Sequence, residues 1–160
     1  MRRAPELQHY RYRGARALVL LHDAEMRRCL AVWQRAKALN VALPETDDED
    51  YASPQHLLVH ILRAARGYLV WVCTQLELPD PDIRPAPDAA DIEREAEGYL
   101  EHVLERWRVP LEGVPEAAFE PEVYLSNWGT PYAVEAMLEH AVMHPIRHRF
   151  QLEELIAAQT

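Results

Sequence analysis

Three histidines recur at every fourth position near the C-terminus, and Gln151 follows the last of them three residues later. They are His140, His144 and His148. On an α-helix, residues three or four positions apart lie along one stripe, so this spacing predicts a helix that presents all four side chains together. Because two histidines one turn apart can hold a single metal ion, the pattern indicates a metal site. A further ligand must then come from another part of the chain.

The length and composition fit one helical domain. The chain has 160 residues, of which 49% are apolar and 27% are charged, with only five glycines. A chain of this length can bury a single core, so we expect one domain over residues 1–160. The many Ala, Leu, Glu and Arg residues favour an all-α class. The two cysteines, Cys29 and Cys73, lack the spacing of a metal site and are interpreted as buried thiols.

The charge and the apolar segments restrict the partners. With 26 acidic and 17 basic residues the formal net charge is −9, which argues against nucleic acid as a partner. Uninterrupted apolar runs such as Ala17 to Leu21 are too short to span a bilayer, and the N-terminal segment lacks the apolar stretch of a signal peptide. We therefore expect no membrane association and a cytoplasmic location.

Apolar residues at helical spacing predict four helices. These helices cover residues 12–39, 54–78, 88 or 91 to 107, and 130–158. Ser53-Pro54 and Thr130-Pro131 are typical helix starts, because the hydroxyl can cap the first turn and proline is tolerated at the first helical position. Pro145 should bend the last helix without ending it.

The connections between these helices differ in character. The acidic segment from Pro44 to Asp50 is interpreted as a solvated loop. Four prolines between positions 79 and 87 indicate a long, stiff crossover between the second and third helices. The long segment 109–129 is interpreted as a flap, with Tyr124 and Trp128 as the candidates to wall a pocket.

Two histidines on the second helix can supply the missing ligand. His56 and His60 stand one turn apart, and His60 lies deeper among aliphatic residues. We therefore favour His60 as the ligand and His56 as a neighbour of the site. His22, near the apolar stripe of the first helix, is interpreted as a histidine at the core boundary, with a role in the pocket as the alternative.

Together these features resemble the DinB-like superfamily of metal-binding four-helix bundles. The resemblance extends over essentially the whole chain, but its specific part is small: Ser53-Pro54 with His60, and His140, His144, His148, Arg149 and Gln151. It implies an up-down-down-up bundle with long loops between helices two and three and between helices three and four. It also implies that His60, His144 and His148 bind the metal, with His140 and Gln151 supporting them. Phe150 stands where the family commonly has glycine.

Three neutral imidazoles without a fourth protein ligand leave open positions on a divalent ion, which is typical of a catalytic site. Histidine suits both zinc and nickel, so either ion is expected. The resemblance implies a metal-dependent thiol S-transferase, an isomerase or a hydrolase that acts on a small molecule, with a low-molecular-weight thiol as one candidate. The general base is left open among His22, His56 and His140.

Two other interpretations remain. In one, the ion only ties two helices together in a non-catalytic stress-response or interaction protein, so that metal binding contributes stability alone. In the other, the histidines bind nothing. For the assembly we expect a homodimer, the commonest soluble oligomer.

Overall fold

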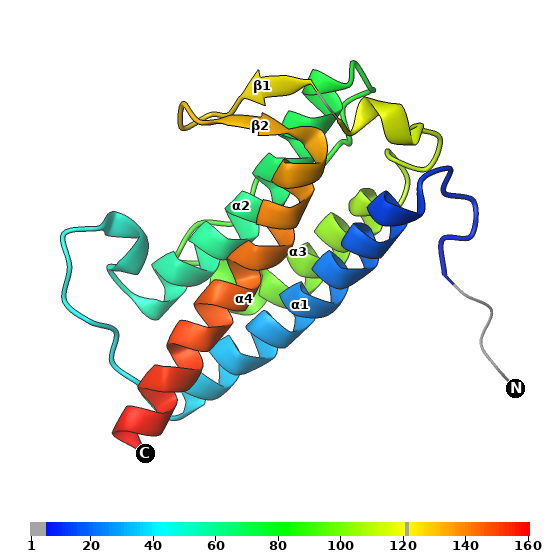
Figure 1. The fold of residues 1–160 in the computed structure, drawn as a ribbon. Coiled ribbons are helices and arrows are strands. Elements are labelled where there is room, and N and C mark those ends of the chain that lie inside the picture. The colour runs from blue at the N-terminus through cyan, green and yellow to red at the C-terminus, as the bar shows by residue number, and fades with distance from the viewer. Residues whose placement is uncertain (1–5, 121) are drawn as a thin grey trace, which may run out of the picture.

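The computed structural model describes residues 6–120 and 122–160, and the chain is mostly helical (Figure 1). Its elements are α1 (Arg13–Ala38), η1 (Glu49–Tyr51), α2 (Pro54–Gln75), α3 (Ile92–Trp107), η2 (Glu116–Ala118), β1 (Val123–Leu125), β2 (Pro131–Ala133) and α4 (Val134–Gln159), where η marks a short 3-10 helix. The prediction of four long helices is confirmed. The all-α class needs one addition, because β1 and β2 pair as a small antiparallel sheet.

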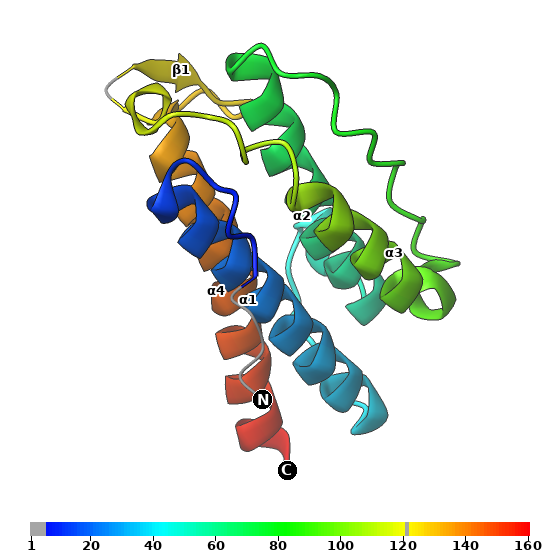
Figure 2. The same cartoon turned by 90° about the vertical axis from the view of Figure 1, so that its right-hand side faces the viewer.

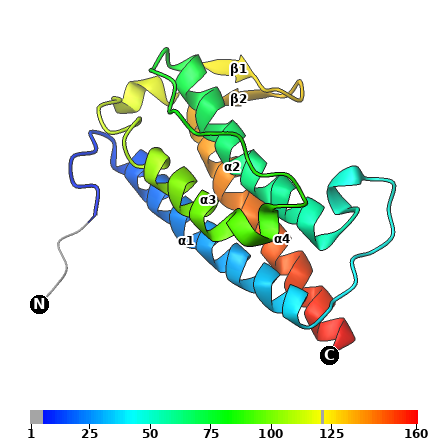
Figure 3. The ribbon, with the colours of Figure 1, turned by 180° about the vertical axis from the view of Figure 1, so that it is seen from behind.

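The four helices lie alongside one another. α1 packs mainly against α4, and α2 packs against both α3 and α4. Figure 2 shows that the segment 76–91, which contains the four prolines, leaves the end of α2 and returns along the outside of the helices before α3 begins. α2 and α3 therefore run in the same direction. Figure 3 shows the same segment from behind.

The end of α1 and the start of α2 fix the two ends of the segment 41–53, which connects these helices. Asn40 has a left-handed φ of 53°, and the Val41 N–H donates to the Ala36 carbonyl over 3.0 Å. This arrangement commonly closes a helix. Ser53 begins α2 as predicted, because its hydroxyl accepts a hydrogen bond of 3.2 Å from the N–H of His56. The segment 41–53, which carries η1, is thereby held beside α2.

The start of the last helix differs from the prediction. Thr130-Pro131 does not cap it, since Pro131 lies in β2 opposite Leu125 of β1 and α4 begins only at Val134. The strands are joined by a turn in which Gly129 has a φ of 86°, a conformation that suits glycine. The predicted flap thus ends in a β-hairpin.

The core contains large aromatic rings and both thiols. Trp107 is almost fully buried, and its Nε1 donates to the Ala65 carbonyl over 3.0 Å, which satisfies the indole N–H. Cys29 and Cys73 are free and buried, as predicted. Burial raises the pKa of Cys29 to about 12 and that of Cys73 to about 11, so both thiols are protonated at neutral pH.

One helix within residues 6–120 and 122–160, α2, is long and apolar enough to cross a membrane by length and composition. In its most apolar window, 61% of the residues are buried inside the protein. The core helix of a globular protein meets the same two criteria, so this finding is weak evidence for a membrane span.

Candidate metal centre

Three of the predicted side chains meet between α2 and α4. The Nε2 atom of His144 lies 3.0 Å from that of His60 and 3.3 Å from that of His148. Ligand nitrogens of all three lie within 4.8 Å of one another, and we call this group the histidine cluster. Zinc binds histidine nitrogens at about 2.0–2.1 Å, which at a tetrahedral angle separates two nitrogens by about 3.3 Å. The cluster therefore fits one divalent ion.

The helices themselves bring the cluster together. His144 and His148 are one turn apart on α4, and His60 comes from α2, which packs against α4. α4 continues through Pro145 without a break, as predicted, so both histidines remain on one helix. His144 and His148 are buried with 4% and 2% exposure, whereas the His60 side chain keeps 28%. The cluster is thus closed on the α4 side and accessible from the α2 side.

The outer nitrogens of two cluster members have fixed partners. His60 Nδ1 lies 2.9 Å from Asp50 Oδ2, and His148 Nδ1 lies 3.1 Å from Gln151 Oε1. A carboxylate or an amide oxygen requires an N–H donor, so Nδ1 carries the proton in both rings and Nε2 keeps its lone pair. Metal-binding histidines in proteins are oriented in the same way. Gln151 thus contacts the cluster at the position where the sequence predicted a supporting residue.

Asp50 was missed from the sequence. The acidic segment was interpreted as a solvated loop, but its last residues form η1, which packs against α2 and turns Asp50 toward His60. Tyr51 from the same turn lies 3.5 Å from His148 Nδ1 through its hydroxyl. No periodicity marks either residue, because their place depends on how the loop folds back on α2.

The buried rings of the cluster are neutral. Burial lowers the pKa of His144 to about 2, with further lowering by His148, His60 and Arg147. Burial also lowers the pKa of His148 to about 4, again with help from His60 and Arg147. Only a neutral imidazole has the free lone pair that a metal ion requires.

A cavity of about 350 Å³ adjoins the cluster. It is bordered by His60 and His144, and its walls include Tyr68, Trp71 and Trp128. The indole of Trp71 also donates to the Leu125 carbonyl over 3.1 Å, so the hairpin is attached to α2 beside this cavity. The prediction that Trp128 walls a pocket therefore agrees with the structure.

The second aromatic candidate, Tyr124, has a different place. It is not part of the cavity wall and packs edge-on against Trp71 with ring centroids 6.2 Å apart. Its hydroxyl donates to Glu122 over 2.9 Å at the protein surface. Tyr124 therefore packs against a wall residue without bordering the cavity itself.

His140 lies beside the cavity but outside the cluster. Its ring is surrounded by Tyr68, Trp128 and Tyr132, with centroid distances of 5.4, 5.3 and 5.6 Å. Tyr68 also packs edge-on against His144 at 5.6 Å. His140 therefore contacts the aromatic group that borders the cluster, and its supporting role stays a prediction.

The two remaining histidine candidates lie elsewhere. His22 is 1% exposed, stacks on Trp107 at 4.1 Å, and has no hydrogen-bond partner for either ring nitrogen within the described residues. His56 is exposed, and its Nδ1 lies 2.7 Å from Ser53 Oγ at the start of α2. Neither borders the cavity, so the structure favours the core interpretation of His22 over the pocket alternative and places His56 away from the pocket. His22 belongs to the core and His56 to the helix cap.

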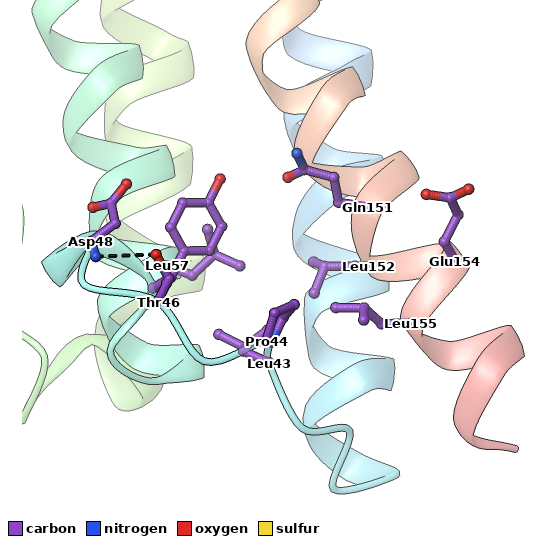
Figure 4. A pocket seen from close by; sticks show the side chains of 10 residues that line it. Leu43, Pro44, Thr46, Asp48, Leu57, Gln151, Leu152, Glu154 and Leu155 are labelled. Atoms are coloured by element: carbon purple, nitrogen blue, oxygen red, sulfur yellow. Dashed lines mark hydrogen bonds between the residues drawn. The ribbon is translucent and has the colours of Figure 1, made fainter.

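A second cavity of about 380 Å³ lies on the other side of the cluster, between segment 43–48 and α4 (Figure 4). Tyr51 and Gln151, the two partners of His148 Nδ1, are part of its wall. Figure 4 shows Leu152 and Leu155 of α4 pointing toward the segment that contains Leu43. Half of the lining residues of this groove are aliphatic, and the groove reaches the two partners of His148 Nδ1.

Comparison of the chain with protein-family models, with curated proteins and with solved structures found no match. The geometry of the residues described above therefore carries the functional argument.

Proposed function

We propose that this protein is a metal-dependent enzyme that binds one divalent ion, zinc or nickel, through His60, His144 and His148. The observation that carries the proposal is the convergence of three Nε2 atoms beside a cavity that two of the three histidines border. We further propose that the four helices form the up-down-down-up bundle of the DinB-like superfamily. The shared direction of α2 and α3 supports this (Figure 2).

The chemistry follows from the number of ligands. Three protein nitrogens leave room for exchangeable ligands, and an ion held in this way supplies a Lewis acid and lowers the pKa of a coordinated water or thiol. Asp50 and Gln151 hold the His60 and His148 rings with Nε2 toward the common centre. The aromatic walls offer an apolar surface beside the space where a small substrate would lie.

Tyr68 is placed to donate a proton or a hydrogen bond to the substrate. It borders the cavity, and its hydroxyl makes no hydrogen bond to any of the described residues. Burial raises the pKa of Tyr68 to about 12, so the phenol keeps its proton at neutral pH. The neutral Tyr68 phenol lies beside the histidine cluster. It can donate a hydrogen bond to a substrate oxygen or sulfur on which negative charge develops.

We propose thiol S-transfer or hydrolysis of a small molecule as the reaction, with a low-molecular-weight thiol as one substrate. The cavity and the exposure of the His60 side chain favour an enzyme over a stress-response or interaction protein in which the ion only joins two helices. An ion that only joins two helices does not require an adjoining cavity bordered by the Tyr68 phenol. A homodimer in the cytoplasm stays a prediction.

The proposal is tested by metal-restored activity. The protein, purified without a histidine tag, is stripped of metal and screened for thiol transfer and for amide and ester hydrolysis before and after addition of zinc or nickel. We expect activity only with metal, a reduction of about 10-fold or more in Tyr68→Phe, and unchanged activity in His56→Ala. Activity that is absent with both ions, or equal with and without them, would contradict the proposal.

A further inference from the structure

Only two charged side chains, Asp50 and Arg63, border the cavity beside the histidine cluster among the described residues. Asp50 is engaged with His60 Nδ1 at 2.9 Å. Arg63 makes no ion pair and no hydrogen bond within the described residues. Although Asp50 borders the same cavity, Arg63 forms no ion pair with it, so the guanidinium leaves a positive charge for a ligand.

Arg63 stands one helical turn from the metal site. It follows His60 by three residues on α2, which corresponds to about 4.5 Å along the helix axis and to the same side of the helix. A small molecule that reaches the cluster with one end can therefore reach Arg63 with the other. Asn127, from the turn of the hairpin, borders the same cavity and offers an amide donor.

A second unpaired guanidinium adds to the positive potential. Arg147 follows His144 by three residues on α4 and likewise makes no ion pair within the described part of the chain. The Arg147 side chain is exposed and does not border this cavity, so its charge can act on a ligand only over a longer range.

From these features we propose that the substrate is an anion, with a carboxylate or phosphate group held by Arg63 while its reacting group lies at the histidine cluster. The guanidinium presents paired N–H donors that match two oxygens of either group. Arg147 adds attraction without being part of the cavity wall. This inference rests on the proposed function, since it names the substrate class for the same site.

The test compares two thiols of equal chain length, mercaptopropionate and mercaptopropanol, by isothermal titration calorimetry on zinc-loaded protein, with bound zinc measured separately. We expect the carboxylate thiol to bind about 10-fold tighter than the alcohol, as charge-assisted hydrogen bonds are worth that much. Arg63→Gln should abolish the preference, and Arg63→Lys should keep part of it. The matched control Arg35→Gln removes an exposed arginine of α1 that forms no ion pair with residues 6–120 or 122–160, and it should change nothing.

The outcomes separate this inference from the proposed function. Bound zinc with equal affinity for both thiols, or a preference that survives in Arg63→Gln, would overturn the anion site alone. A preference that depends on Arg63 in protein that binds no zinc would support the anion site and contradict the metal enzyme. No zinc and no preference would overturn both. Inorganic phosphate is then titrated as a competitor of mercaptopropionate. Displacement of the thiol indicates a site that binds phosphate, and no displacement indicates a carboxylate site.

Discussion

His60 Nδ1 lies 2.9 Å from Asp50 Oδ2, so a residue of the loop before α2 orients a ring whose other nitrogen faces His144 at 3.0 Å. This contact links the only cluster member on α2 to η1, the short helix that precedes it. The position of the His60 ring therefore depends on both α2 and η1.

Asp50→Asn should weaken metal binding. The amide removes the negative charge that accepts the hydrogen bond from His60 Nδ1–H, and loss of such a partner typically reduces metal affinity about 10-fold to 100-fold. Competition with a chromophoric zinc chelator measures the change. Asp47→Asn, a neighbouring exposed carboxylate, is the control and should bind zinc as the parent does. Equal affinity in both variants would show that the His60–Asp50 contact does not support the metal.

Trp128→Ala should open the cavity without disturbing the metal. Trp128 borders the cavity and packs against His140 at 5.3 Å and Tyr68 at 6.4 Å. Losing one aromatic wall should weaken binding of mercaptopropionate about 3-fold to 10-fold, while zinc content stays the same. Val123→Ala alters an exposed residue of the same hairpin and should have no effect. Loss of zinc in Trp128→Ala would mean that the hairpin holds the cluster itself.

The pH dependence of stability should reveal His22. Burial lowers its pKa to about 3, whereas an unfolded chain takes up the proton near the ordinary value of 6.5. The unfolded state thus binds the extra proton first, and the parent loses stability as the pH falls from about 6.5 toward 3. His22→Leu removes this part of the loss. From pH 7 to pH 4.5, the variant should gain roughly 2–3 kcal/mol relative to the parent.

Urea unfolding at both pH values, with a chelator present to remove any contribution of metal, measures this difference. His9→Leu replaces an exposed histidine and should unfold in parallel with the parent at both pH values. If the stability of His22→Leu changes between the two pH values by as much as that of the parent, the His22 ring is not held neutral in the core.

The helical part of the fold could be predicted because the sequence signals were local. Ser53 caps α2 and Asn40 follows α1, and both residue types are typical of these positions. His144 and His148 could be recognised as a pair from their four-residue spacing alone. His60 was found because a pair on one helix needs a third ligand, and α2 offered two histidines.

The rest depended on tertiary structure. Thr130-Pro131 matches a helix start, but Asn127-Trp128-Gly129 between two β-favouring segments is also typical of a hairpin turn, and pairing of Pro131 with Leu125 decided the outcome. Asp50 was missed because a polar loop has no period that tells which residue turns inward. Tyr68 stands at helical spacing among the apolar residues of α2, and only the packing of α2 on α4 shows that it also borders the cavity.

The most direct measurement is the metal content of the untagged protein by mass spectrometry, for the parent and for His60→Ala, His144→Ala and His148→Ala, with His56→Ala as the control on the same helix. We predict one zinc or nickel per chain in the parent and in His56→Ala, and loss of the ion in each cluster variant. A parent that takes up neither ion at micromolar concentrations, or cluster variants that retain it, would contradict the metal centre.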